Sequence, residues 1–199
     1  MADSTERTFA EPNEEIMRAT HRALRNYGYA DLTIKRIAEE YGKSTAAVHY
    51  YYETKDDLLV AFLDYLLGQF VDSIEDVETA DPERRLELLL DELLVEPGEN
   101  QDLLVAVLEM RSQTPFEEAF RERFHRNDEY IRDMLEAVID RGIDEGVFDD
   151  VDADHVSRVL MTIVDGSHSR AVVQGETDPL SAGRRAADEF TTAVLLDDQ

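Results

Sequence analysis

Three carboxylate–histidine pairs have the spacing of metal ligands on one face of a helix. They are Glu122 with His125, Asp152 with His155 and Asp165 with His168. Di-iron bundles use two Glu-x-x-His pairs together with two further Glu. Chance weakens this signal, because 46 of the 199 residues are Asp or Glu and Asp152 also lies where it can cap a helix. A metal-binding helical bundle, or an enzyme built on one, is therefore kept as the alternative function.

Other catalytic motifs are missing from the sequence. The absence of Cys excludes thiol catalysis and Cys-ligated zinc. We find no Gly-rich phosphate loop, no Gly-x-Ser-x-Gly and no His-Glu-x-x-His. The sequence therefore predicts a protein that is not an enzyme and that uses no cofactor and no metal.

The distribution of charge points to a phosphate-binding segment in a strongly acidic chain. The net charge is −26, from 46 Asp and Glu against 20 Lys and Arg. Residues 1–60 hold eight of the basic residues and eleven of the acidic ones, and all the lysines lie between Lys35 and Lys55. Phosphate contact is the clearest need for lysine there, although three residues can also cluster by chance. The lysine-poor, carboxylate-rich composition resembles that of proteins from extreme halophiles.

The elements that position these residues are predicted to be helices throughout. Apolar residues recur at steps of three and four, strand-like alternation is scarce, and an apolar fraction of 43% supports a real core. We predict an all-α fold of about nine or ten helices. The predicted helices cover residues 14–27, 34–40, 45–51, 55–75, 83–94, 102–112, 116–145, 153–173 and 181–195. The chain has no apolar run of about 18–20 residues and no secretory h-region, so we expect a cytoplasmic protein with no membrane partner.

Residues 33–48 have the spacing of a helix-turn-helix motif. Ala38 is small enough for a second helix to cross the first, and Gly42 suits a turn that needs positive φ. Val48 then faces inward from the second helix, while Ile34 and Ile37 fill the space between the helices. An ordinary helical hairpin also uses Ala and Gly, so the spacing alone leaves both interpretations open.

Residues 28–59 resemble the amino-terminal domain of the tetracycline-repressor (TetR) family. The matching residues are Gly28, Thr33, Ile37, Ala38, Gly42, Ser44, the aromatic run His49 to Tyr52, Lys55, Leu58 and Leu59. The usual family pattern is Tyr-x-His-Phe, whereas here His49, Tyr51 and Tyr52 take the Tyr, His and Phe places. The rest of the chain matches the family in length, helical character and order of elements.

The resemblance implies a dimeric transcriptional regulator, most often a repressor that a small molecule releases from a near-palindromic operator in double-stranded DNA. It implies a helix-turn-helix DNA-binding domain over residues 1–54 and a larger helical ligand-binding and dimerisation domain over residues 55–199. The DNA-binding residues expected on this basis are Thr33, Lys43, Ser44, Thr45, Ala46, Ala47, His49, Tyr50, Tyr51 and Lys55.

The predicted DNA contacts differ in kind. The third helix of such a domain enters the major groove with its amino-terminal part toward base edges, so we expect base contacts from Thr45, Ala46 and Ala47. Lys55 lies at a helix start, where phosphate is favoured. His49 can serve either as a phosphate donor or in packing at the domain junction.

The resemblance also implies a homodimer and an effector of unknown identity. The long helix over residues 116–145 and the helix over 153–173 resemble the dimerisation pair of the family, and Gly166 would allow close backbone approach there. The family usually builds its ligand pocket between the middle helices. The residues expected there are Met110, Arg111, Gln113, Phe116, Phe120 and Phe124, although a Met and Phe stripe is also typical of ordinary core.

Overall fold

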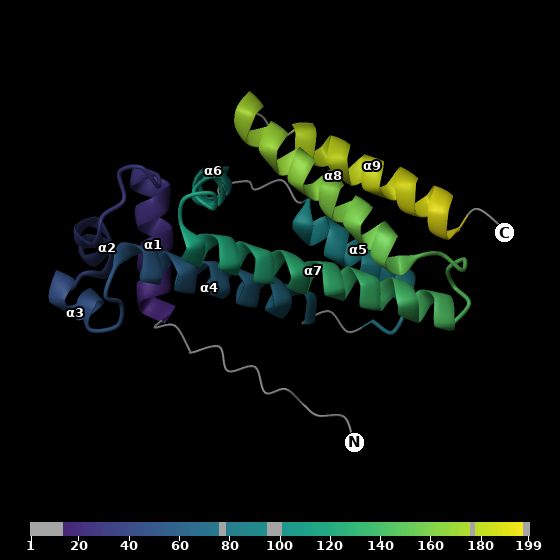
Figure 1. The fold of residues 1–199 in the computed structure, drawn as a ribbon, viewed down its shortest axis with the longest axis horizontal. Coiled ribbons are helices and arrows are strands. Elements are labelled where there is room, and N and C mark those ends of the chain that lie inside the picture. The colour runs from purple at the N-terminus through teal and green to yellow at the C-terminus, as the bar shows by residue number, and fades with distance from the viewer. Residues whose placement is uncertain (1–13, 76–78, 95–100, 176–177, 197–199) are drawn as a thin grey trace, which may run out of the picture. The chain divides into compact units, whose positions relative to one another are not determined.

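A computed structural model describes residues 14–75, 79–94, 101–175 and 178–196 of the chain. Over these ranges it contains nine α-helices and no strand, which confirms the predicted all-α fold (Figure 1). The helices are α1 (Glu14–Tyr27), α2 (Ile34–Tyr41), α3 (Thr45–His49), α4 (Lys55–Glu75), α5 (Pro82–Leu93), α6 (Gln101–Ser112), α7 (Glu118–Asp144), α8 (Ala153–Gln174) and α9 (Asp178–Leu195). None of these helices is both long and apolar enough to cross a membrane.

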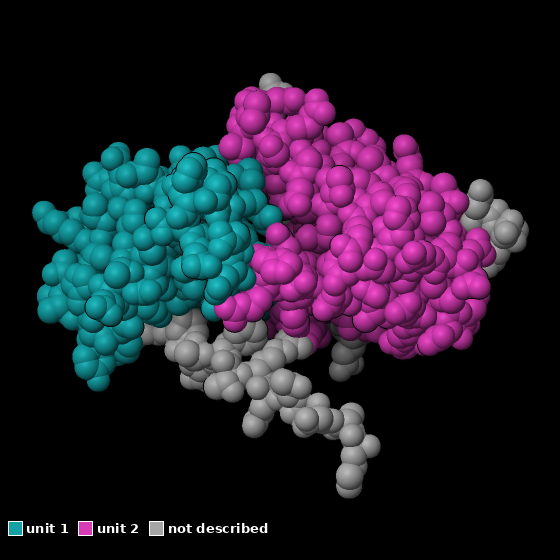
Figure 2. Space-filling model, in the orientation of Figure 1, with its two compact units in different colours: residues 1–69, 105–124 teal, residues 70–104, 125–199 magenta. Residues whose placement is uncertain are grey.

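The chain divides into two compact units (Figure 2). Unit 1 contains residues 1–69 and 105–124, and unit 2 contains residues 70–104 and 125–199. These units describe how the chain packs, whereas the predicted division at residue 54 concerns function and stays a prediction.

Hydroxyl side chains cap the second and third helices of the first unit. The Thr33 hydroxyl accepts a hydrogen bond from the backbone N–H of Arg36 at 3.2 Å, and the Ser44 hydroxyl accepts one from that of Ala47 at 3.3 Å. Gly42 ends α2 with φ of +71°, the left-handed conformation that glycine adopts without steric cost. The helix α3 ends two residues earlier than predicted, because the chain tightens where Tyr51 N–H bonds to the Val48 carbonyl three positions back.

Apolar residues of α1 to α4 form the core of unit 1. The apolar stripe on α1 is buried from Ile16 to Leu24, whereas Tyr27 in the last turn is 38% exposed and lies under the Arg36 guanidinium, 4.4 Å from the ring centroid. Ala38, the small residue predicted at the helix crossing, and Val48, predicted to face inward, are 3% and 0% exposed. The motif therefore has the packing that its residue spacing predicts.

In unit 2, α8 and α9 form an antiparallel pair (Figure 1). Gly183 of α9 approaches Ser167 of α8 so closely that a methyl group at Gly183 would overlap the Ser167 side chain. Buried residues of α5, α7, α8 and α9 complete the core. They include Leu89, Leu90, Leu135, Ile139, Leu160, Ala187 and Leu195. The last helix begins three residues before its predicted start and includes Pro179 in its first turn, where proline is tolerated.

Gly142 in α7 is required for packing, whereas Gly68 in α4 is not. A Cβ at Gly142 would overlap the buried ring of Phe148, while a Cβ at Gly68 would meet nothing within 4 Å. We therefore expect Gly142→Ala to lower the free energy of unfolding by about 1–3 kcal/mol. The matched variant Gly68→Ala should raise it by about 0.5–1 kcal/mol, because alanine is the better helix former. Chemical denaturation measures both, and equal effects of the two variants would contradict this account.

Candidate nucleic-acid interface

The amino-terminal half of α3 presents a small exposed face. Because Val48 is fully buried, α3 presents Thr45 and Ala46 to solvent, while Ala47 at the edge of this face is partly buried. The exposed side chains offer one hydroxyl and two methyl groups. A hydroxyl can hydrogen-bond to a base edge, and methyl groups can contact thymine methyl groups.

Aromatic side chains follow directly after this face. Tyr50 and Tyr51 are 82% and 52% exposed and meet edge to face, with ring centroids 5.0 Å apart. His49 is also exposed, which fits a phosphate donor better than packing, whereas Tyr52 is partly buried. Each of these two tyrosines presents a hydroxyl group to solvent on an apolar ring beside α3.

The lysines lie in α2, in the turn before α3 and at the start of α4, and each already has an anionic or aromatic neighbour. The Lys35 ammonium lies 3.8 Å from the Glu39 carboxylate, and the Lys55 ammonium lies 4.8 Å from the centroid of the Tyr29 ring. The Lys43 ammonium donates to the Tyr41 hydroxyl at 2.9 Å, and this hydrogen bond raises the Lys43 pKa above its ordinary value. Thr33, another of the predicted DNA contacts, is exposed where it caps α2.

Two arginines at this surface escaped the prediction from sequence. Arg18 and Arg22 of α1 line a hollow of about 390 Å³ together with Glu15, Tyr41 and Lys43. Their four-residue spacing, which places both on the exposed side of α1, was the available signal.

The residues predicted to bind an effector are only partly brought together. Met110, Phe120 and Phe124 are buried, and the Arg111 guanidinium lies 4.7 Å from the centroid of the Phe124 ring. Phe116, in contrast, is 81% exposed, and Gln113 lies partly buried in the turn between α6 and α7. All of these residues belong to unit 1, the unit that contains α1 to α3.

Two polar links within unit 1 join this region to the elements around the helix-turn-helix. The Glu109 carboxylate of α6 accepts a hydrogen bond from the backbone N–H of Tyr29 at 3.3 Å. Arg123 of α7 pairs with Asp64 of α4, and both side chains are less than one-fifth exposed. Removal of either partner of such a shielded pair leaves the other charge poorly solvated.

Comparison with known proteins connects this geometry to a family. Residues 16–62 match the bacterial regulatory proteins of the tetR family, and residues 82–196 match the family described as BetI-type transcriptional repressor, C-terminal. The chain belongs to the TetR family of transcriptional regulators. The resemblance that residues 28–59 indicated is thereby confirmed.

Known proteins are similar to this TetR-family chain over most of its length. The crystal structure of a TetR transcription regulator from Haloarcula marismortui is 69% identical, covers 92% of this chain and 97% of its own, and superposes with a TM-score of 0.87. The HTH-type transcriptional repressor AcnR from Corynebacterium diphtheriae is 27% identical over 168 residues, 84% of each chain. A putative transcriptional regulator from Saccharomonospora viridis, solved in complex with choline, has a TM-score of 0.78 at 24% identity and covers 92% of this chain and 96% of its own.

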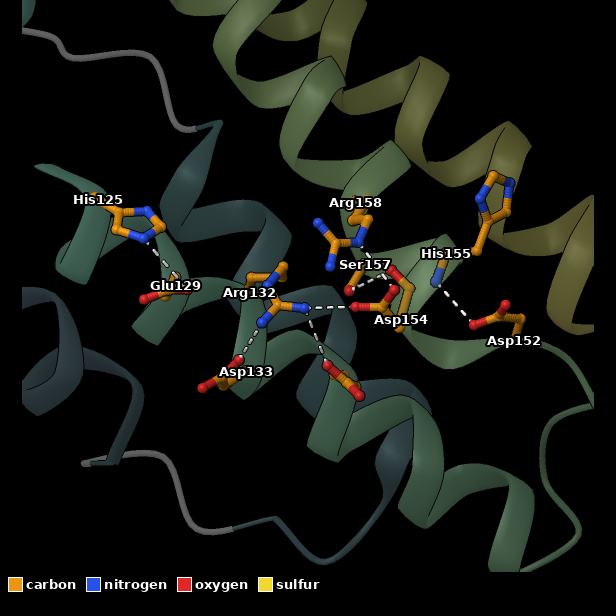
Figure 3. Close-up of polar contacts among 10 residues, drawn as sticks. His125, Glu129, Arg132, Asp133, Asp152, Asp154, His155, Ser157 and Arg158 are labelled. Atoms are coloured by element: carbon orange, nitrogen blue, oxygen red, sulfur yellow. Dashed lines mark hydrogen bonds and ion pairs between the residues drawn. The ribbon is translucent and has the colours of Figure 1, made fainter.

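Family membership decides against the alternative of an enzyme, and each of the three histidines makes an ordinary structural contact, His155 through its backbone N–H. His125 lies 3.5 Å from Glu129, and the Asp152 carboxylate caps α8 by accepting from the backbone N–H of His155 at 3.0 Å (Figure 3). His168 Nε2 lies 2.8 Å from the backbone carbonyl oxygen of Leu93. Within the described ranges no three His, Asp or Glu side chains converge as metal ligands would.

An ion-pair network links α7 to α8 in this TetR-family chain (Figure 3). Asp154 accepts from Arg132 of α7 and, at 2.9 Å, from Arg158 of its own helix. Arg132 also lies 2.9 Å from Asp133 and 3.5 Å from Glu136. The hydrogen bond from Arg158, followed by the charges of Arg158 and Arg132, holds the pKa of Asp154 below its ordinary value.

The lowered pKa makes the contribution of Asp154 to stability dependent on pH. The folded state binds the proton less readily than the unfolded chain, so the stabilisation is full above the ordinary pKa of 3.8 and is lost as pH falls through the lower folded value. We expect the free energy of unfolding of Asp154→Asn to lie below that of the unchanged protein near neutral pH, and the two to converge as pH falls below about 4.

Denaturation at several pH values in concentrated KCl measures this convergence. Asp140→Asn, which removes an exposed carboxylate from α7, controls for the loss of one negative charge. A difference between Asp154→Asn and the unchanged protein that stays constant down to about pH 2 would show that the network does not titrate in this way.

Proposed function

We propose that this chain represses transcription as a homodimer that covers a near-palindromic operator and leaves it when a small molecule binds. The observation that carries this proposal is the exposed face of Thr45 and Ala46, fixed outward by the buried Val48, preceded by Lys43 and followed by the exposed Tyr50 and Tyr51. Residues 1–54 act as the DNA-binding domain in this proposal, and residues 55–199 bind the effector and the second copy.

The DNA contacts follow from exposure and charge. Thr45, Ala46 and Ala47 face base edges in the major groove. The remaining predicted residues reach the phosphate backbone through hydroxyl, imidazole and ammonium groups. They are Thr33, Lys43, Ser44, His49, Tyr50, Tyr51 and Lys55.

The exposed surface of unit 2 favours a dimer interface on α8 and α9 over the pair predicted from sequence, residues 116–145 with 153–173. The outward face of α7 bears five exposed carboxylates, which a two-fold axis would bring near their own copies. They are Glu122, Glu129, Asp133, Asp140 and Asp144. Between α8 and α9, in contrast, small residues line an open hollow of about 540 Å³, and Val173 is 82% exposed.

Small side chains and charges of both signs make the face of α8 and α9 suitable for contact with the same face of a second copy. A Cβ at Gly166 would meet nothing within 4 Å, so the backbone there is open to close approach. Ala182 and Ala186 are exposed on the neighbouring face of α9. Arg158, Arg170, Arg185, Asp165, Asp178, Asp188 and Glu189 supply both signs of charge on these two helices. In the symmetric dimer the two copies of α3 must lie about 34–36 Å apart, or a multiple of one turn.

The effector site that we propose lies around Met110, Arg111 and Phe124, with Gln113, Phe116 and Phe120 at its margins. An effector there would act on the same compact unit that carries α3, since Glu109 bonds to Tyr29 ahead of α2 and Arg123 pairs with Asp64 of α4. A shift of α6 or of the start of α7 would therefore move the reading helices and change their spacing in the dimer.

Substitution of Thr45 and of Lys55 tests the DNA contacts. With a duplex selected from a random pool by the unchanged protein, Thr45→Ala should weaken binding about fivefold and relax the preference at one base pair. Lys55→Ala should weaken binding to all duplexes alike and reduce the slope of log affinity against log salt by about 1. Fluorescence anisotropy over a series of KCl concentrations measures both effects.

Thr192→Ala, an exposed position on α9, serves as the control for these variants. Unchanged melting of Thr45→Ala shows that the fold is intact. Affinities of both variants equal to that of the control would reject α3 as the reading helix.

Two arginine substitutions distinguish the candidate dimer interfaces. Ala186→Arg on α9 should convert the dimer to monomer, because a long charged side chain cannot be accommodated where two small-residue faces meet. Ala137→Arg, on the exposed face of α7, should leave the dimer intact. Sedimentation velocity in concentrated KCl measures the state of each variant, and dissociation by Ala137→Arg alone would favour the interface predicted from sequence.

A further inference from the structure

The hollow beside α3 combines three cationic groups, a hydroxyl and one carboxylate. It is lined by Arg18, Arg22, Tyr41, Lys43 and Glu15, and its volume is about 390 Å³. Lys43 immediately precedes Ser44, the cap of α3, so the hollow lies next to the end of α3 that faces base edges in the proposed complex. A duplex seated on that end brings its sugar–phosphate backbone close to the side chains that flank it.

The cationic side chains of this hollow differ in the number and strength of their contacts with carboxylates. Arg22 donates to the backbone carbonyl of Glu40 at 2.7 Å and to its carboxylate at 3.3 Å, and the Glu40 side chain is only 20% exposed. Asn26 donates to the same carboxylate at 2.8 Å. This set ties α1 to α2 and is part of the structure of the unit.

Lys43 and Glu15, in contrast, form a single contact that is easily exchanged. Their closest atoms are 3.4 Å apart, and their side chains are 51% and 73% exposed. Exposed pairs of this kind contribute little to stability, so replacing Glu15 by another anion costs little. The Tyr41 hydroxyl, 2.9 Å from the Lys43 ammonium, holds that ammonium at the hollow whichever anion faces it.

We propose that Glu15 occupies, in the free protein, the place that a DNA phosphate takes at Lys43 and Tyr41 in the complex. Arg18 of the same hollow is held by Glu14, whose carboxylate lies 2.5 Å away. The inference rests on the proposed function and adds a second contact to the DNA backbone, from the end of α2 and the turn before α3. Glu15 therefore competes with the DNA phosphate for Lys43. It weakens DNA binding because its own contact with Lys43 has to break and because its negative charge repels the incoming phosphate. The exchange takes place at contact distance, so it persists at about 1 M salt, where the screening length is still about 3 Å.

Removal of the competitor should therefore strengthen DNA binding. Glu15→Gln keeps the size of the side chain and removes its charge, and we expect it to bind the selected duplex about three- to fivefold more tightly than the unchanged protein. Glu87→Gln is the matched control, because Glu87 pairs with Arg84 at 2.7 Å on α5 and its loss changes the net charge equally. In a Lys43→Met background, Glu15→Gln should give no gain beyond that of the control.

Anisotropy titrations of the four variants at about 0.2 and about 1 M KCl decide the question. Equal affinities of Glu15→Gln and Glu87→Gln overturn this inference, and so does a gain that persists in Lys43→Met. Either result leaves the proposed function standing, because the unchanged protein still binds the duplex. Failure of the unchanged protein to select any duplex overturns the proposed function and this inference with it.

Discussion

Burial of Val48, on the helix that packs against α2, is the interaction on which the rest of the molecule's function depends. The helix α3 is only five residues long, too short to be stable alone, so its orientation comes from packing and from its cap. Val48 is fully buried, Ala38 leaves room for the crossing, and Gly42 turns the chain through positive φ between them. These three residues place Thr45 and Ala46 in solvent, where a base edge can meet them.

The main constraint on such a surface is electrostatic. A chain with a net charge of −26 has to approach a polyanion, and its cations near α3 already face carboxylates or aromatic rings. Concentrated salt removes the long-range repulsion but also the long-range attraction, so affinity has to come from groups in contact. The acidic composition is consistent with the 69% identity to a regulator from Haloarcula marismortui. In such an environment, which carboxylate lies against which lysine matters more than the net charge.

The division into compact units gives regulation a physical route. Residues 105–124 pack with α1 to α3 and the first part of α4, so the predicted effector residues share a unit with the reading helix. Glu109 and Arg123 connect them to Tyr29 and Asp64 through polar groups that are costly to leave without partners. In the proposed mechanism, a ligand that binds one arrangement of this unit more tightly would shift the population toward that arrangement and so change the orientation of α3.

Local chemistry made much of the fold predictable. The caps Thr33, Ser44 and Asp152, the left-handed Gly42 and the apolar stripes depend on neighbours within four residues, and the sequence determined them by itself. Only the tertiary structure decided which charges meet. Arg22 with Glu40 and Arg132 with Asp154 are pairs between different helices, and Glu15 of α1 meets Lys43 of the turn before α3. With 46 carboxylates available to 20 cations, spacing along the chain cannot select such partners, because they are chosen by where the packed cores place each helix face.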